Sequence, residues 1–228
     1  MARPVRGRTL TNAAGGVGAV VLAAGSGSRL GGRPKSLLEL DGVPLIRRLV
    51  AALTAAGAQD LVVVLGHHGP VIEAALQGAG ARCVFNPQPD EGQVMSQRLG
   101  LAALRGGHEA VIVALADQPL IDADDVGALL RAWARRSVQV QLLYPRVDGQ
   151  PGNPVIFSAA VREQILRSEP SVGARQWRDA HPGAVAAIDT PNPHFRLDID
   201  TPEDLARFQR ETGRALVWPP ALAGAHGA

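Results

Sequence analysis

Residues 22–35 read LAAGSGSRLGGRPK, and this stretch governs the interpretation of the whole chain. Residues 17–23, which overlap the start of this stretch, form a continuous apolar run that is typical of a buried parallel strand. A glycine-rich segment after such a strand offers backbone N–H groups to an anion, and Arg29 and Lys35 add positive charge within reach of it. Lys35 is the sole lysine of the sequence, and its compact ammonium suits a phosphate that moves during a reaction. The stretch therefore predicts a triphosphate site.

Two better-known phosphate-binding loops fit this stretch poorly. A P-loop requires Gly-Lys followed by Ser or Thr, whereas Pro34 precedes Lys35 here. A dinucleotide-binding loop requires a third glycine, but Leu30 stands at that position. It also requires a helix directly after the loop and an acidic residue at the end of the second strand, where this sequence has Gly66. A glycine-rich turn with surface cations and no ligand stays open as an alternative.

Strand-like and helix-like segments alternate after this stretch. The predicted strands cover 61–65, 82–85, 110–116, 138–144 and 155–157, with a weaker one at 185–188. The predicted helices cover 44–56, 70–76, 96–104, 122–133, 159–166, 172–180 and 202–211. Asp122 and Thr201 are expected caps of two of these helices. The alternation predicts an α/β fold, a Rossmann-like, doubly wound and mostly parallel sheet, with its ligand site at the carboxyl ends of the strands.

Length and composition limit the classes of function. A chain of 228 residues with 46% hydrophobic residues is expected to form one domain, over 17–211, between a disordered arm at 1–16 and a loose tail at 212–228. Apart from Arg3, Arg6 and Arg8 in the arm, 20 basic residues face 21 acidic ones, which disfavours nucleic acid as a partner. A lone cysteine, Cys83, fits a reducing cytoplasm, and no apolar stretch is long enough to predict a membrane span.

Further motifs follow in a fixed order along the chain. They read LDGVPLI at 40–46, NP at 86–87, GQVMS at 92–96, DQP at 117–119, GNPV at 152–155 and DIDTPED at 198–204. Together with 22–35, these motifs resemble the MobA-like nucleotidyltransferase family, and most closely the molybdenum cofactor cytidylyltransferases, over about residues 17–210. The resemblance implies a fold of the nucleotide-diphospho-sugar transferase type. Two positions depart from the family pattern, because Gln118 replaces the usual Met and Asn153 replaces the usual His.

The resemblance also implies roles for individual residues. Lys35, Arg29 and Asp117 are the expected catalytic residues. The expected nucleotide-binding residues are Leu22, Ala23, Ala24, Gly25, Ser26, Gly27, Ser28, Arg29, Lys35, Asn86 and Ser96, the last as the cap of a helix. Asp117, at a strand end, offers Mg²⁺ a hard carboxylate ligand, and Asp198 or Asp200 is expected to complete the metal site, with Asp198 favoured. The expected acceptor-binding residues are Gly152, Asn153 and Pro154.

The reaction expected from this resemblance joins CMP from CTP to the phosphate of molybdopterin cofactor. CTP is favoured because Ala24 stands where guanylyltransferase relatives carry glycine. The alternatives are transfer of GMP to the same cofactor, transfer to another small phosphorylated acceptor, and a nucleotide-binding or cofactor-binding module without turnover. The protein is expected to be a monomer that serves a molybdoenzyme or its chaperone, without a membrane or nucleic-acid partner.

Overall fold

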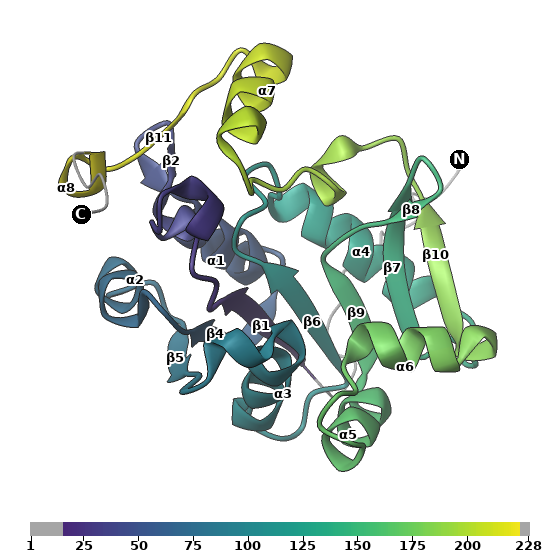
Figure 1. The fold of residues 1–228 in the computed structure, drawn as a ribbon. Coiled ribbons are helices and arrows are strands. Elements are labelled where there is room, and N and C mark those ends of the chain that lie inside the picture. Colours follow the sequence, from purple (N-terminus) through teal and green to yellow (C-terminus); the bar gives the residue numbers. More distant parts are fainter. Residues whose placement is uncertain (1–15, 224–228) are drawn as a thin grey trace, which may run out of the picture.

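A mixed, mostly parallel β-sheet forms the centre of the computed structural model, which describes residues 16–223 (Figure 1). Its strands run in the order β10-β7-β9-β6-β1-β4-β5, with β8 beside β7. β6, β1, β4 and β5 are mutually parallel, whereas β9 runs antiparallel to both β6 and β7. The strands are β1 (Val17–Ala23), β4 (Ala58–Leu65), β5 (Arg82–Phe85), β6 (Ala110–Leu115), β7 (Leu142–Val147), β8 (Gln150–Pro151), β9 (Val155–Ser158) and β10 (Val185–Asp189).

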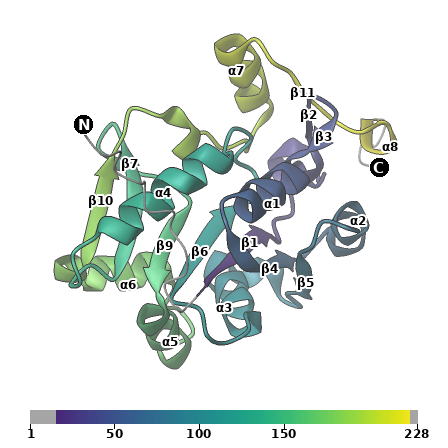
Figure 2. The ribbon, with the colours of Figure 1, turned by 180° about the vertical axis from the view of Figure 1, so that it is seen from behind.

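Helices cover both faces of this sheet, because successive residues of its buried strands point to opposite sides. Ala19 and Val21 of β1 belong to the core on one face, beneath α1 (Leu45–Ala55), α2 (Gly69–Ala75) and α4 (Ala123–Arg135). Val20 and Leu22 belong to the core on the other face, with α3 (Gln93–Ala103), α5 (Ala159–Arg167) and α6 (Ala174–Ala180). Figure 2, seen from behind, shows α1 and α4 in front of the sheet. The predicted doubly wound, mostly parallel sheet is confirmed, with β9 as an antiparallel member.

A smaller antiparallel sheet lies at the edge of the molecule, next to α7 (Pro202–Thr212). It consists of β2 (Glu39–Leu40), β3 (Val43–Pro44) and β11 (Leu216–Val217), and α8 (Pro220–Ala223) follows it. Its core centres on Leu38, Leu40 and Phe208, and Leu216 and Trp218 pack against them. The expectation of a loose segment from 212 onward is therefore wrong for the described residues, because β11 pairs with β2. Residues 1–15 of the predicted arm, with Arg3, Arg6 and Arg8, lie outside the described part of the chain.

Among the predicted elements, α3 and β7 begin three or more residues away from the expected position. α3 starts at Gln93, directly after Gly92, whose φ of 98° lets the chain turn into the helix. Ser96 therefore lies inside α3 and does not cap it, which corrects the prediction. β7 covers Leu142–Val147 instead of 138–144, since residues 137–140 form a turn. Pro145, without an N–H, falls between the residues paired to β9 and those paired to β8, so the strand continues through it.

No helix within residues 16–223 is long and apolar enough to cross a lipid bilayer.

Candidate active site

The glycine-rich loop after β1 is folded into a tight turn. Gly27 has a φ of 64°, and a Cβ atom at this position would lie 1.9 Å from the carbonyl oxygen of Arg33. Only glycine fits this approach. The carbonyl of Gly27 accepts hydrogen bonds from Leu30 N (2.8 Å) and Gly32 N (3.0 Å), which close the turn. His68, from the loop after β4, donates through Nε2 to the carbonyl of Ser26 (2.8 Å), so the loop is anchored to the neighbouring strand.

A cavity of about 220 Å³ lies where this loop meets the carboxyl ends of β1 and β6. The predicted site residues that line it are Leu22, Ala23, Ala24, Gly25, Lys35, Ser96 and Asp117. Four predicted nucleotide-binding residues of the loop, Ser26, Gly27, Ser28 and Arg29, and also Asn86, do not line it. Parallel strands bind ligands at their carboxyl ends, because the loops that follow them converge there. The structure therefore brings the loop and the DQP motif of residues 117–119 to one cavity.

Lys35 is the charged centre of this cavity. Its Nζ lies 2.5 Å from Asp117 Oδ2 and 2.5 Å from Asp200 Oδ1. Burial acts against its charge, but the adjacent carboxylates of Asp117 and Asp200 outweigh that effect and raise the pKa of Lys35 above its ordinary value. Lys35 is therefore an ammonium at neutral pH. Arg29 is different, because its side chain is 71% exposed and its Nη1 lies 3.8 Å from Asp200 Oδ2.

The three predicted metal ligands form an acidic group around Lys35. Burial, reinforced by the charges of Asp117 and Asp200, raises the pKa of Asp198. Oδ1 of Asp117 is buried and has no hydrogen-bond partner among the described residues. Buried carboxylate oxygens without donors are what a hard divalent cation requires, so these residues fit Mg²⁺. Asp117 and Asp198 would hold the ion, with Asp200 beside them.

The backbone of the acidic loop is held by the start of α7. Asp204 Oδ2 accepts from Asp200 N (3.0 Å) and Thr201 N (2.9 Å), while Thr201 caps the helix as expected. Burial acts to raise the pKa of Asp204, but these hydrogen bonds and Arg207 lower it below its ordinary value. Asp204 therefore stays ionised and fixes the position of Asp200.

A second cluster of possible metal ligands lies at the start of α4 and does not line this cavity. Ligand atoms of Asp122, Asp125 and His194 lie within 4.8 Å of one another. Their oxygens, however, already accept hydrogen bonds: Asp122 caps α4 by accepting from Asp124 N, and Asp125 accepts from Asn192 Nδ2 (2.6 Å) and His194 Nδ1 (2.8 Å). This cluster caps a helix and ties the loop before Phe195 to α4.

Asn86 supports Ser96, a residue of the cavity wall, from a neighbouring segment. Asn86, fully buried after β5, donates through Nδ2 to Ser96 Oγ (2.9 Å), and its Oδ1 accepts from Gln88 N (2.9 Å). Asn86 therefore shapes the wall without lining it.

Ser36, which the sequence analysis missed, lines the cavity with a buried Oγ that has no partner among the described residues. Its place directly after Lys35 is the one signal that could have pointed to it.

The carbonyl oxygen of Phe195 joins two of the predicted motifs, and the carbonyl oxygen of Asp117 joins a third to them. It accepts from Gln118 Nε2 (3.0 Å) and from Asn153 N (2.8 Å). A Cβ atom at Gly152 would lie 2.5 Å from the same oxygen, so glycine is needed there for the close approach. The carbonyl of Asp117 accepts from Ile199 N (3.1 Å), which adds the acidic loop to this junction. The DQP, GNPV and DIDTPED motifs are therefore adjacent in space.

A second cavity, of about 470 Å³, lies beside the first. Gly152 and Asn153 line it, while Pro154 is buried and does not. Leu22, Gln93 and Leu115 line both cavities, so the two are contiguous. The sequence analysis missed three further lining residues, Arg175, Arg178 and Arg196. The first two lie three residues apart in a predicted helix, which places them near each other on its surface.

Comparisons with known proteins identify relatives of this chain. Residues 19–187 match the family model of the MobA-like NTP transferase domain. The chain is 30% identical over 194 residues to nicotine blue oxidoreductase of Paenarthrobacter nicotinovorans, covering 83% of this chain and 94% of that protein. It is 40% identical over 187 residues to the bifunctional protein GlmU of Sorangium cellulosum, covering 78% of this chain and 38% of that protein.

A solved structure shows the same fold. A nucleotidyl transferase from Methanothermobacter thermautotroptrophicus superposes with a TM-score of 0.69, at 24% identity, over 86% of this chain and 97% of that one. The predicted nucleotide-diphospho-sugar transferase type of fold is thereby confirmed. The family match covers the strands, the glycine-rich loop and the DQP motif that build the first cavity. This chain therefore belongs to the family of MobA-like NTP transferase domains.

Proposed function

We propose that this protein transfers CMP from CTP to the phosphate of a molybdopterin-type cofactor and releases pyrophosphate. The observation that carries the proposal is the position of Lys35, which bridges Asp117 and Asp200 at a cavity lined by the loop after β1. A cation between two carboxylates, below a glycine-rich loop, suits a triphosphate and a divalent metal together.

The proposed reaction is an in-line displacement at phosphorus. A phosphate oxygen of the acceptor attacks the α-phosphorus of CTP, a new P–O bond forms, and the bond to the β-phosphate breaks so that pyrophosphate leaves with its electron pair. Lys35 and the more exposed Arg29 stabilise the negative charge that builds up on the departing phosphates. Asp117 and Asp198, with Asp200, would hold Mg²⁺, which would supply positive charge against the triphosphate. The loop N–H groups orient the phosphates.

The choice of CTP has one structural support besides the resemblance. Ala24 lines the first cavity, so the difference between alanine here and glycine in guanylyltransferase relatives falls on its wall. The alanine methyl group occupies room that a glycine would leave free, which favours the smaller pyrimidine base over a purine. GMP transfer, or transfer to another small phosphorylated acceptor, is the alternative within the same chemistry.

An oxidoreductase is the second candidate function, and the similarity to nicotine blue oxidoreductase over 94% of that protein favours it. The residues do not favour a nicotinamide cofactor at the glycine-rich loop, because Leu30 and Pro34 depart from the dinucleotide pattern. This candidate is therefore tested beside the first. We further propose that the protein acts in the reducing cytoplasm, where Cys83 stays free, and passes its product to a molybdoenzyme or its chaperone.

The test is pyrophosphate release by the full chain with Mg²⁺ and purified molybdenum cofactor. CTP, GTP, ATP and UTP are offered separately, with controls that lack the acceptor. We expect acceptor-dependent release with CTP alone. Release with GTP alone would overturn the role given to Ala24, and no release with any nucleotide would overturn the molybdopterin acceptor. Loss of blue colour when nicotine blue is offered with NADH or NADPH would instead support the oxidoreductase.

A further inference from the structure

Helix α3 contributes to the walls of both cavities. Gln93 lines both of them, Ser96 lines the first, and Gln97 lines the second. Residues three and four positions apart share a face of a helix, so this face of α3 continues from the first cavity into the second. The floor of the second cavity includes Val113 of β6 and Val155 of β9. Gln97 is therefore a polar group beside an apolar floor.

The side-chain amide of Gln97 has one defined orientation. The residue is only 8% exposed, and its Oε1 accepts from the N–H of Ala174, the first residue of α6, at 2.7 Å. A backbone N–H can only donate, so the amide atom that faces Ala174 is the oxygen, and Nε2 points away from it. A Cβ atom at Gly173 would lie 2.5 Å from the same Oε1, so glycine at this position leaves room for the amide.

The Nε2 group of Gln97 has no hydrogen-bond acceptor within residues 16–223. It is also not one of the polar atoms of this part of the chain that are both unpaired and sealed from solvent, so it reaches open space. Because Gln97 lines the second cavity, that space is the cavity. A buried amide donor is unfavourable unless it is paired, so a ligand that brings an acceptor atom to Nε2 is stabilised there.

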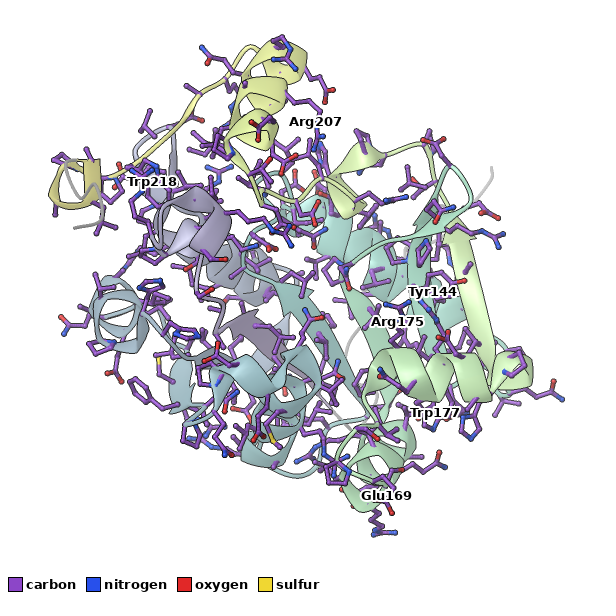
Figure 3. All side chains as sticks on the ribbon, in the orientation of Figure 1. Tyr144, Glu169, Arg175, Trp177, Arg207 and Trp218 are labelled. Atoms are coloured by element: carbon purple, nitrogen blue, oxygen red, sulfur yellow. The ribbon has the colours of Figure 1, made fainter. Side chains whose placement is uncertain are left out.

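The segment that orients Gln97 is itself held in place by the next residue of α3. The guanidinium group of Arg98 donates to the carbonyls of Ser168 (3.1 Å) and Val172 (3.2 Å), in the loop that leads to α6. Figure 3 marks α6 by the label of Arg175. The amide of Gln97 is thus fixed before a ligand arrives, and a fixed donor loses little conformational entropy on binding.

We propose that Gln97 is a specificity-determining residue of the second cavity, and that its Nε2 donates to a carbonyl oxygen or ring nitrogen of the pterin of the acceptor. This inference rests on the proposed function, in which a molybdopterin-type acceptor occupies that cavity. A pterin is a planar ring system with both kinds of acceptor atom, and it can lie on the apolar floor. A planar ring system of similar size without acceptor atoms leaves Nε2 unpaired and binds less well.

The inference is tested by equilibrium dialysis of two planar probes against the full chain, at about pH 8, where a glutamate carboxyl is ionised. 6-Hydroxymethylpterin has acceptor atoms in and on its rings, whereas the two rings of naphthalen-2-ylmethanol have none. Gln97→Met removes both Oε1 and Nε2. Gln97→Glu keeps an oxygen for the N–H of Ala174 and removes only the donor. The control is Gln209→Met, at an exposed residue of α7 that lines neither cavity. Circular dichroism checks that each variant is folded.

We expect Gln97→Met and Gln97→Glu each to bind 6-hydroxymethylpterin about tenfold more weakly than the wild type and the Gln209→Met control. All four proteins should bind naphthalen-2-ylmethanol within about twofold of one another. Wild-type affinity for the pterin in Gln97→Glu would mean that Gln97 only holds α6, and would overturn the inference. Tighter pterin binding by Gln97→Glu, an equal loss for both probes, or no binding of 6-hydroxymethylpterin to the wild type would also overturn it.

The two proposals fail in different ways. Dialysis requires no turnover, whereas the proposed function is judged by pyrophosphate release. Turnover with molybdenum cofactor, together with unchanged pterin binding in the Gln97 variants, would overturn only the role of Gln97. Pterin binding that depends on Gln97, without turnover on molybdenum cofactor, would overturn the proposed transfer reaction and leave the pterin contact in place.

Discussion

Lys35 donates to Asp200 through an Nζ–Oδ1 contact of 2.5 Å, although the two residues are 165 positions apart in the sequence. The contact joins the segment that follows the glycine-rich loop to the acidic loop before α7. It also separates the roles of the two acids in that loop. Asp200 is engaged by Lys35, while Asp198 has a pKa raised by burial and by its acidic neighbours. Because Lys35 pairs with Asp200 and not with Asp198, Asp198 stays the favoured partner of Asp117 in the proposed metal site.

Replacing Lys35 by Gln should lower kcat for pyrophosphate release by about 10²–10³-fold, because a positioned charge on the departing phosphates is lost. The measurement is steady-state release under saturating CTP and acceptor. Arg210→Gln, which removes a positive charge on α7, is the matched control and should keep wild-type turnover. A Lys35→Gln enzyme within about tenfold of wild type, a loss of under roughly 1.4 kcal/mol, would contradict the assignment.

Substituting the metal ligands should change the dependence on Mg²⁺. Asp117→Asn and Asp198→Asn should each shift the Mg²⁺ concentration for half-maximal activity upward by about tenfold or more, because each loses a charged oxygen ligand. Titration of activity against Mg²⁺ measures the shift. Asp124→Asn, at an exposed acid of α4, is the control. An unaltered Mg²⁺ dependence in both variants would place the metal elsewhere.

Replacing Gln118 by Met restores the residue usual in the family. The variant loses the hydrogen bond to Phe195 O, but Asn153 N still satisfies that oxygen. The free energy of unfolding should therefore change by no more than about 1 kcal/mol. The KM for the acceptor should rise while the KM for CTP stays constant, because Phe195 O also binds Asn153 N, and Asn153 lines the second cavity. Equal changes in both KM values would show that Gln118 acts on the whole site.

Trp218 should matter to the nucleotide although it lies near the end of the chain. Its ring lies 4.2 Å from the guanidinium carbon of Arg33, and Figure 3 shows it beside the small sheet. Trp218→Ala removes a cation–π contact of about 0.5–2 kcal/mol and loosens the segment before Lys35. We expect a raised KM for CTP, with Trp218→Phe close to wild type. A lowered Tm with unchanged kinetics in Trp218→Ala would restrict its role to stability.

Asp60 gives the fold a defined dependence on pH. Burial acts to raise its pKa, but hydrogen bonds from Arg82 Nη2 (2.8 Å) and Arg105 N (2.7 Å) outweigh this and lower it below the ordinary 3.8. The stabilisation is therefore full above pH 3.8 and is lost progressively as the pH falls toward the lower pKa of the folded state. Urea unfolding of wild type and Asp60→Asn at a series of pH values measures it.

At pH 7, Asp60→Asn should be less stable than the wild type by about 1–3 kcal/mol, because it loses charge-assisted hydrogen bonds. The difference should shrink as the pH falls below 3.8. A difference that stays constant down to pH 2 would mean that packing, and not the charge of Asp60, carries the effect.

Much of the fold could be predicted because its signals are local. The apolar run of β1, the cap at Asp122 and the Thr201-Pro202 start of α7 depend on neighbouring residues, and the structure agrees with each. One error, the loose segment expected after 212, occurred where distant contacts decide the structure. The described residues after 212 take up a fixed place because Leu216 and Trp218 pack against Leu40, which is far away in the sequence. Such pairing leaves no periodic pattern in the sequence.

The amino-acid sequence by itself determined the alternation of strands and helices, the glycine-rich turn and the identity of its charged residues, because backbone propensity and burial act over a few positions. Only the tertiary structure decided which charges meet. In the folded protein Lys35 lies between Asp117 and Asp200, and Asn86 donates a hydrogen bond to Ser96 without lining the first cavity. Arg175 and Arg196 both line the second cavity. These contacts arise from strand order and loop packing, which bring together side chains that the chain keeps far apart.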